Sequence, residues 1–156
     1  MRAFDYIEIR IPAKPQYVSV IRLTISGMAT RIGFSYDQIE DLKIAVSEAV
    51  TNVVQHAYQG IEDGEIVIGS ALYPHKIEVM ISDFGSSFNF EEVKSNIGPY
   101  RDYENVELIR EGGLGLFLME TLMDEVRVNN EGGATVFMTK YVTREQVGED
   151  VEQIST

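Results

Sequence analysis

Apolar residues change their spacing several times along the chain, and each spacing is typical of one kind of element. Near the N-terminus Ile7, Ile9 and Ile11 alternate with more polar residues, a period of two that predicts a half-buried strand. From Pro15 the apolar positions recur at intervals of three and four, which predicts an amphipathic helix ending at Gly33. Its apolar positions are Val18, Ile21, Ile25, Met28 and Ile32.

A second helical stripe follows Gly33. Asp37 and Glu40 have the spacing of a capping box, so the helix is expected to begin there and to run to about Tyr58. The apolar stripe of this helix consists of Ile39, Leu42, Val46, Ala49, Val50, Val53 and Ala57.

The rest of the chain alternates strand signals with one long aperiodic stretch. Residues 65–73 and 77–82 are β-rich and flank Pro74, which predicts a hairpin. Residues 84–112 keep no clear period, and a connection of that length is uncommon unless it is functional or disordered, so a lid is expected. Helical spacing returns at 115–123, and the strands 125–130 and 134–142 follow, joined by a glycine-containing turn.

This order of elements predicts the fold class. Strands that follow strands favour hairpin pairing, so we expect an α/β (α+β) two-layer sandwich with a mostly antiparallel sheet and helices on one face. A chain of 156 residues suits a single core. Residues 1–142 are therefore expected to form one domain, and the polar residues 143–156 a frayed tail.

Composition narrows the function classes. The chain has no cysteine, which excludes disulfides and thiolate chemistry and fits a reducing compartment. No stretch has the features of a signal peptide or the roughly 18 apolar residues of a membrane span, so the cytoplasm is expected. We therefore expect no membrane partner either. A net charge of −12 argues against nucleic-acid binding and suits basic protein partners.

Candidate chemistry begins on the second predicted helix. Glu48, Asn52 and His56 are spaced at i, i+4 and i+8 and therefore share one flank, while the apolar stripe faces the core. Taken alone, such side chains are typical of a solvated helix face. Other segments are needed to give them a function.

Two glycine motifs supply that context. Asp83 and Gly85 close a β-rich segment, and the run 112–116 opens a helix after the aperiodic stretch. Glycines let backbone N–H groups approach an anion, and a helix N-terminus adds a partial positive charge, so a phosphate site is physically reasonable. Either motif alone could equally be a turn or an ordinary helix start.

In this order the motifs resemble the Bergerat ATP-binding fold of the GHKL superfamily, which is the histidine-kinase-like ATPase group. Residues 39–52, 55–58, 111–116 and 118–128 are most similar to the anti-sigma-factor branch, whose members are serine-protein kinases. The resemblance covers roughly residues 6–141, nearly the whole chain. Two serines follow Gly85, where many superfamily members have a further glycine, and we interpret them as a marker of this branch.

The resemblance implies a role for each candidate residue. Glu48 would be the general base, Asn52 the ligand of a Mg²⁺ that bridges the ATP phosphates, and Asp83 the acceptor of the adenine amino group, with Gly85 giving the base room. The other nucleotide-binding positions implied are Gly113, Leu114, Gly115 and Leu116 at the phosphates, Arg110 in the lid, Thr135 beside the adenine, and His56. Arg110 could instead be a solvated loop residue, and His56 a surface or packing residue.

The resemblance also implies partners. These are a sigma factor of the sigma-B type, which the protein would inhibit, an RsbV-like anti-anti-sigma factor as phosphorylation substrate, and a second copy in a homodimer. A non-enzymatic module that uses ATP only to present a sigma-binding surface is the main alternative. A histidine kinase and an ATPase subdomain of a larger machine are disfavoured, because the chain has neither a histidine-bearing helical hairpin nor a transducer domain.

Overall fold

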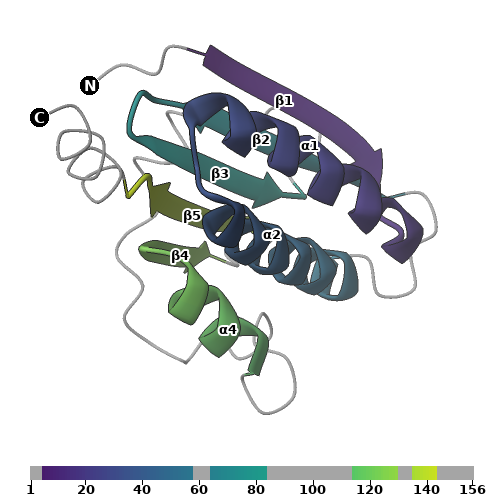
Figure 1. Cartoon of the computed structure of the whole chain (residues 1–156). Coiled ribbons are helices and arrows are strands. Elements are labelled where there is room, and N and C mark those ends of the chain that lie inside the picture. The colour runs from purple at the N-terminus through teal and green to yellow at the C-terminus, as the bar shows by residue number, and fades with distance from the viewer. Residues whose placement is uncertain (1–4, 58–63, 84–113, 130–134, 144–156) are drawn as a thin grey trace, which may run out of the picture.

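The computed structural model describes residues 5–57, 64–83, 114–129 and 135–143, and Figure 1 shows how its elements are arranged. In chain order they are β1 (Asp5–Pro12), the 3-10 turn η1 (Pro15–Tyr17), α1 (Val18–Ile32), α2 (Tyr36–Ala57), β2 (Glu65–Leu72), β3 (Lys76–Ser82), α4 (Leu114–Leu122), β4 (Glu125–Asn129) and β5 (Thr135–Tyr141). Every element predicted in these ranges is confirmed. The predicted lid and all but the first residue of the predicted tail lie outside the described residues.

The strands form one five-stranded sheet in the order β1-β2-β3-β5-β4. All four pairings are antiparallel, as predicted. β5 lies between β3 and β4, so the last strand of the chain is an interior strand of the sheet and β4 forms an edge. Because antiparallel neighbours place opposite residues on the same face, the register divides the sheet into two distinct faces.

One face of the sheet carries the helices. In Figure 1, α1, α2 and α4 all lie on the same side of the sheet, with α2 in the middle, and α2 packs against both α1 and α4. This two-layer arrangement with helices on one face is the predicted fold class. The core between the layers includes Ile21, Ile25, Leu42, Val46, Val50, Val53, Ile68, Ile81, Val136 and Met119.

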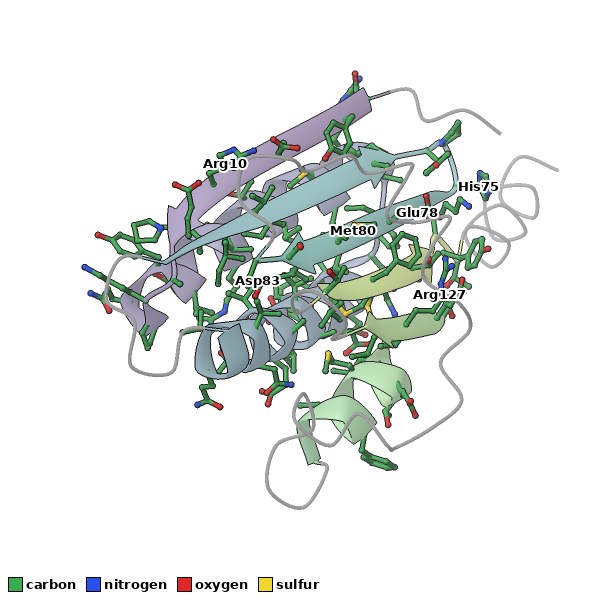
Figure 2. The ribbon with its side chains drawn as sticks, turned by 180° about the vertical axis from the view of Figure 1, so that it is seen from behind. Arg10, His75, Glu78, Met80, Asp83 and Arg127 are labelled. Carbon is green, nitrogen blue, oxygen red and sulfur yellow. The ribbon has the colours of Figure 1, made fainter. Side chains whose placement is uncertain are left out.

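The opposite face of the sheet is also apolar at its centre. Figure 2 looks at the molecule from behind, with Met80 and Glu78 on β3, Arg10 on β1 and Arg127 on β4 labelled. Met80 and its register partner Phe137 are both fully buried. The helices account for the burial of one face only.

The junction between α1 and α2 differs from its prediction in one detail. Gly33 ends α1 with a φ of 104°, the left-handed conformation expected of a glycine cap. The capping box, however, is formed by Ser35 and Gln38: the Ser35 Oγ accepts from the Gln38 N–H at 3.2 Å, and the Gln38 Oε1 accepts from the Ser35 N–H at 3.2 Å. The prediction that Asp37 and Glu40 form this box was wrong.

Candidate nucleotide site

Asn52 is the most unusual polar residue of α2. It is only 3% exposed, although its spacing from Glu48 suggested an open helix flank. Within the described part of the chain, neither its Nδ2 nor its Oδ1 has a hydrogen-bond partner. Leaving a buried amide without a hydrogen bond costs about 1–3 kcal/mol, so this side chain lowers the stability of the fold. Such a group is a candidate for ligand binding.

Glu48 lies one turn before Asn52 on the same helix, and its side chain is half-buried. Residues four apart stack along one side of a helix, so the carboxylate and the buried amide are neighbours. His56 continues this line in the last turn of α2, and its side chain lies outside the described residues. The helix therefore presents a carboxylate and an amide together, as the spacing predicted.

Asp83 follows β3 directly and is half-buried, and Figure 2 shows it at the end of that strand. Thr135 begins β5 opposite Ser82, and the two hydroxyls lie 3.3 Å apart, both fully buried. By the register, Ser82 and Thr135 share the face of Met80, whereas the neighbouring Ile81 faces the helices. Thr135 is thus next to the Asp83 end of β3, and its hydroxyl contacts Ser82.

The structure describes the predicted phosphate-binding segment only from the start of α4. Leu114, Gly115 and Leu116 form its first turn, so the run 112–116 does open a helix, as predicted. The first N–H groups of an α-helix have no partner within the helix and carry a partial positive charge, which favours an anion. Gly85, Arg110 and Gly113 lie outside the described residues. The site residues that the structure places are thus those on α2, at the end of β3 and on β5 and α4.

The candidate site offers one oxygen that suits a magnesium ion. Within the ranges that the structure describes, no three His, Cys, Asp or Glu side chains come together as metal ligands. Mg²⁺ in nucleotide sites is held by one or two protein oxygens, with water and phosphate completing the shell. The amide oxygen of Asn52, to which no described residue bonds, can serve as one such protein ligand.

Comparison with known proteins identifies the family. The model of the histidine kinase-like ATPase domain matches residues 11–140, which include the placed site residues. The chain is 56% identical over 156 residues to the serine-protein kinase RsbW of Oceanobacillus iheyensis, covering 100% of this chain and 99% of that relative. It is 55% identical over 146 residues to the serine-protein kinase RsbW of Bacillus subtilis, covering 94% of this chain and 91% of that one.

The chain belongs to the RsbW family of serine-protein kinases. Membership in this family identifies it as an ATP-dependent kinase with the histidine kinase-like ATPase fold, as the resemblance implied. The non-enzymatic alternative is therefore not retained. No helix in the described ranges is long and apolar enough to cross a membrane.

A solved structure supports the fold independently. The RsbU and RsbW domains of Rv1364c from Mycobacterium tuberculosis match with a TM-score of 0.62 at 23% identity. The match covers 88% of this chain and 32% of that longer chain. At this identity the likeness shows that the RsbW-family fold is shared.

Two polar residues near these elements were not singled out from the sequence. Ser82 is buried against Thr135, and Lys140 is 8% exposed on the helix-facing side of β5. A signal for Lys140 was present, because it continues the inward positions of Val136 and Met138 at a period of two. A lysine at an inward position needs a partner, which only the three-dimensional structure can identify.

Proposed function

We propose that this chain phosphorylates a serine of an RsbV-like anti-anti-sigma factor and also binds and inhibits a sigma factor of the sigma-B type. The observation that carries the proposal is the buried amide of Asn52, which has no partner in the described part of the chain, next to the Glu48 carboxylate on α2. A kinase needs both a polar group reserved for the nucleotide and a base for the acceptor hydroxyl. The RsbW names of the relatives support the choice of partners.

The proposed chemistry is an in-line transfer to a serine hydroxyl. The serine oxygen bonds to the γ-phosphorus while the bond from that phosphorus to the β–γ bridging oxygen breaks, and ADP leaves. Glu48 takes the proton of the hydroxyl, which typically contributes about 10²–10⁴ in rate. A bound Mg²⁺ would neutralise the charge that develops on the phosphate oxygens.

The other residues would hold the nucleotide. The amide oxygen of Asn52 would be the protein ligand of the metal, and the carboxylate of Asp83 would accept from the adenine amino group. The backbone N–H groups of Gly113, Leu114, Gly115 and Leu116 would bind phosphate oxygens at the start of α4. Arg110, Gly85, Thr135 and His56 remain predictions for the lid, the adenine pocket and the phosphate side.

A partner switch follows if one surface serves both proteins. The sigma factor is held until the unphosphorylated antagonist displaces it, and phosphorylation of the antagonist ends that release. In a competition pull-down, unmodified antagonist is expected to displace the sigma factor and phosphorylated antagonist to leave it bound. The reverse order of displacement would contradict the switch.

The decisive test is transfer of labelled γ-phosphate from Mg·ATP to the antagonist, with Glu48→Gln beside the wild type. The amide keeps the size of the side chain and cannot take a proton, so the rate should fall by about 10²–10⁴ while ATP affinity is retained. Label on an antagonist serine in the wild type alone supports both the activity and the base. Equal rates for the two proteins would remove Glu48 from the mechanism.

Two further statements rest on family resemblance. We propose that the protein works as a homodimer, which sedimentation of the purified chain tests directly. We also propose that it acts in the cytoplasm, where a sigma factor meets RNA polymerase; fractionation of cells with an antibody to the chain tests this.

A further inference from the structure

Lys140 makes an unusual contact with the C-terminal end of α4. This contact lies at the opposite end of that helix from the turn proposed to bind phosphate. Its ammonium donates to the main-chain carbonyl of Leu122 at 2.6 Å, and Leu122 is the last residue of α4. The side chain lies on the helix-facing side of β5 and is 8% exposed. The last carbonyls of a helix have no partner within it and carry a partial negative charge, so a buried ammonium is well matched to this place.

Two hydrogen bonds of Asp124, one from its backbone and one to its carboxylate, secure the same junction. The Asp124 N–H donates to the Thr139 carbonyl at 2.9 Å, and the Asp124 Oδ2 accepts from the Tyr141 N–H at 2.6 Å. Three consecutive residues of β5 thus hold the end of α4 and the start of β4. These two bonds fix the turn after the helix, whereas the Lys140 bond is made to the helix itself.

The junction also reaches α2. Gln38, in the first turn of α2, donates to the Tyr141 carbonyl at 3.4 Å and to the Thr143 Oγ1 at 2.5 Å. The end of β5 therefore contacts both helices that carry the proposed phosphate site, α2 with Asn52 and α4 with its N-terminal turn. Because a helix is stiff along its axis, fixing one end of α4 limits where its other end can lie.

We propose that Lys140 is a positioning residue for ATP: it holds the C-terminal end of α4 and so places the N-terminal turn of α4 against the nucleotide phosphates. The proposal rests on the nucleotide site described under the proposed function. It assigns Lys140 no contact with ATP. Its effect is transmitted through the helix, from the carbonyl of Leu122 to the N–H groups of the first turn.

The test compares Lys140→Met with wild type, using calorimetry for Mg·ATP and competitive displacement for adenosine. Methionine keeps the length of the side chain and removes the charged donor. We expect the Kd for Mg·ATP to rise about threefold to thirtyfold, the scale of coupling through packed elements, while the Kd for adenosine changes less than about twofold. A variant whose whole fold is destabilised would weaken both ligands alike. A displaced α4 would weaken only Mg·ATP, because adenosine has no phosphate for α4 to bind.

Kinetics separate positioning from chemistry. The KM for ATP should rise as the Kd does and kcat should stay within about twofold, since α4 contacts the phosphates before and during transfer. Lys140→Arg keeps the charge and the donor, so its affinity for Mg·ATP should stay close to that of the wild type. Lys43→Met is the matched control, because it removes the same charge from a partly exposed lysine that bonds Glu40 at 3.0 Å.

Two results would overturn the positioning role of Lys140. If Lys140→Met binds Mg·ATP as tightly as wild type, or loses ATP and adenosine equally, the positioning role is wrong. If that variant does not fold, Lys140→Leu, which also removes the donor and leaves an apolar side chain, is measured in its place against the same criteria. If the wild type binds no Mg·ATP, the proposed function itself fails and the positioning role fails with it; a wild type that binds, together with an unaffected variant, overturns only the role of Lys140.

Discussion

Asn52 shows at the residue scale how a binding site can cost stability. Its amide is buried with neither polar atom bonded within the described residues, so its desolvation is uncompensated in the absence of ligand. We predict that Asn52→Leu, which is close in size, raises the free energy of unfolding by up to about 2 kcal/mol without nucleotide. The same change should abolish the stabilisation by Mg·ATP. Urea unfolding with and without Mg·ATP measures both effects.

Ser70 provides the matched control. Its hydroxyl is also fully buried and unpartnered among the described residues, but it lies on β2, which β3 separates from β5 and which carries none of the proposed site residues. Ser70→Ala should be neutral or stabilising and should leave the response to Mg·ATP unchanged. If Asn52→Leu were destabilised yet still responded to Mg·ATP, the amide would belong to the core and not to the ligand site.

The sequence predicted which residue types lie on α2 but not how deeply they are buried. Spacing places Glu48 and Asn52 on one side of the helix, and the structure confirms that both belong to α2. Burial depends on how elements from distant parts of the chain pack, as α2 does against both α1 and α4. A helical period contains no information about such neighbours, so the flank resembled a solvated face.

At the scale of single elements, the start of α2 carries a clear energetic prediction. Ser35 and Gln38 satisfy each other's backbone N–H groups, so Ser35→Ala should cost about 0.5–2 kcal/mol of unfolding free energy. Asp37→Ala should cost no more than about 0.5 kcal/mol, because this exposed side chain contributes only through the helix dipole. Denaturant midpoints of the two variants, measured side by side, test the assignment. A larger loss for Asp37→Ala would restore the capping box first predicted.

The elements themselves were well predicted because their signals are local. Alternating apolar and polar residues predicted β1, and apolar intervals of three and four predicted α1 and α2. Gly33, in the left-handed conformation, ends α1 where expected. The capping box was misplaced because Ser35 and Gln38 have the same spacing as Asp37 and Glu40, two residues later. Two overlapping capping boxes can be told apart only by the residue at which the helix begins in the structure.

At the scale of the whole molecule, charge should make stability depend on salt. The net charge of −12 produces self-repulsion that the folded state concentrates. Exposed ion pairs such as Arg31 with Asp5, at 3.8 Å, oppose this effect only weakly, since such pairs contribute about 0–1 kcal/mol each. We therefore predict that the melting temperature rises between about 0.01 M and about 0.1 M NaCl, as the screening length falls from about 30 Å to about 10 Å.

Thermal unfolding in NaCl and in KCl, at constant pH, measures this dependence. The two chlorides should act alike, because screening depends on ionic strength and not on the cation. A melting temperature that falls with salt would mean that attractive pairs outweigh the net repulsion.

By itself the sequence determined the element order, the antiparallel class of the sheet, the family, and the kinds of side chain on each element, because all of these depend on local periods and motifs. Only the tertiary structure decided that β5 lies between β3 and β4, that Asn52 is buried with no partner among the described residues, and that Lys140 bonds the end of α4. These features join residues far apart in the chain. Their energies come from desolvation and from contacts between elements, which no local pattern contains.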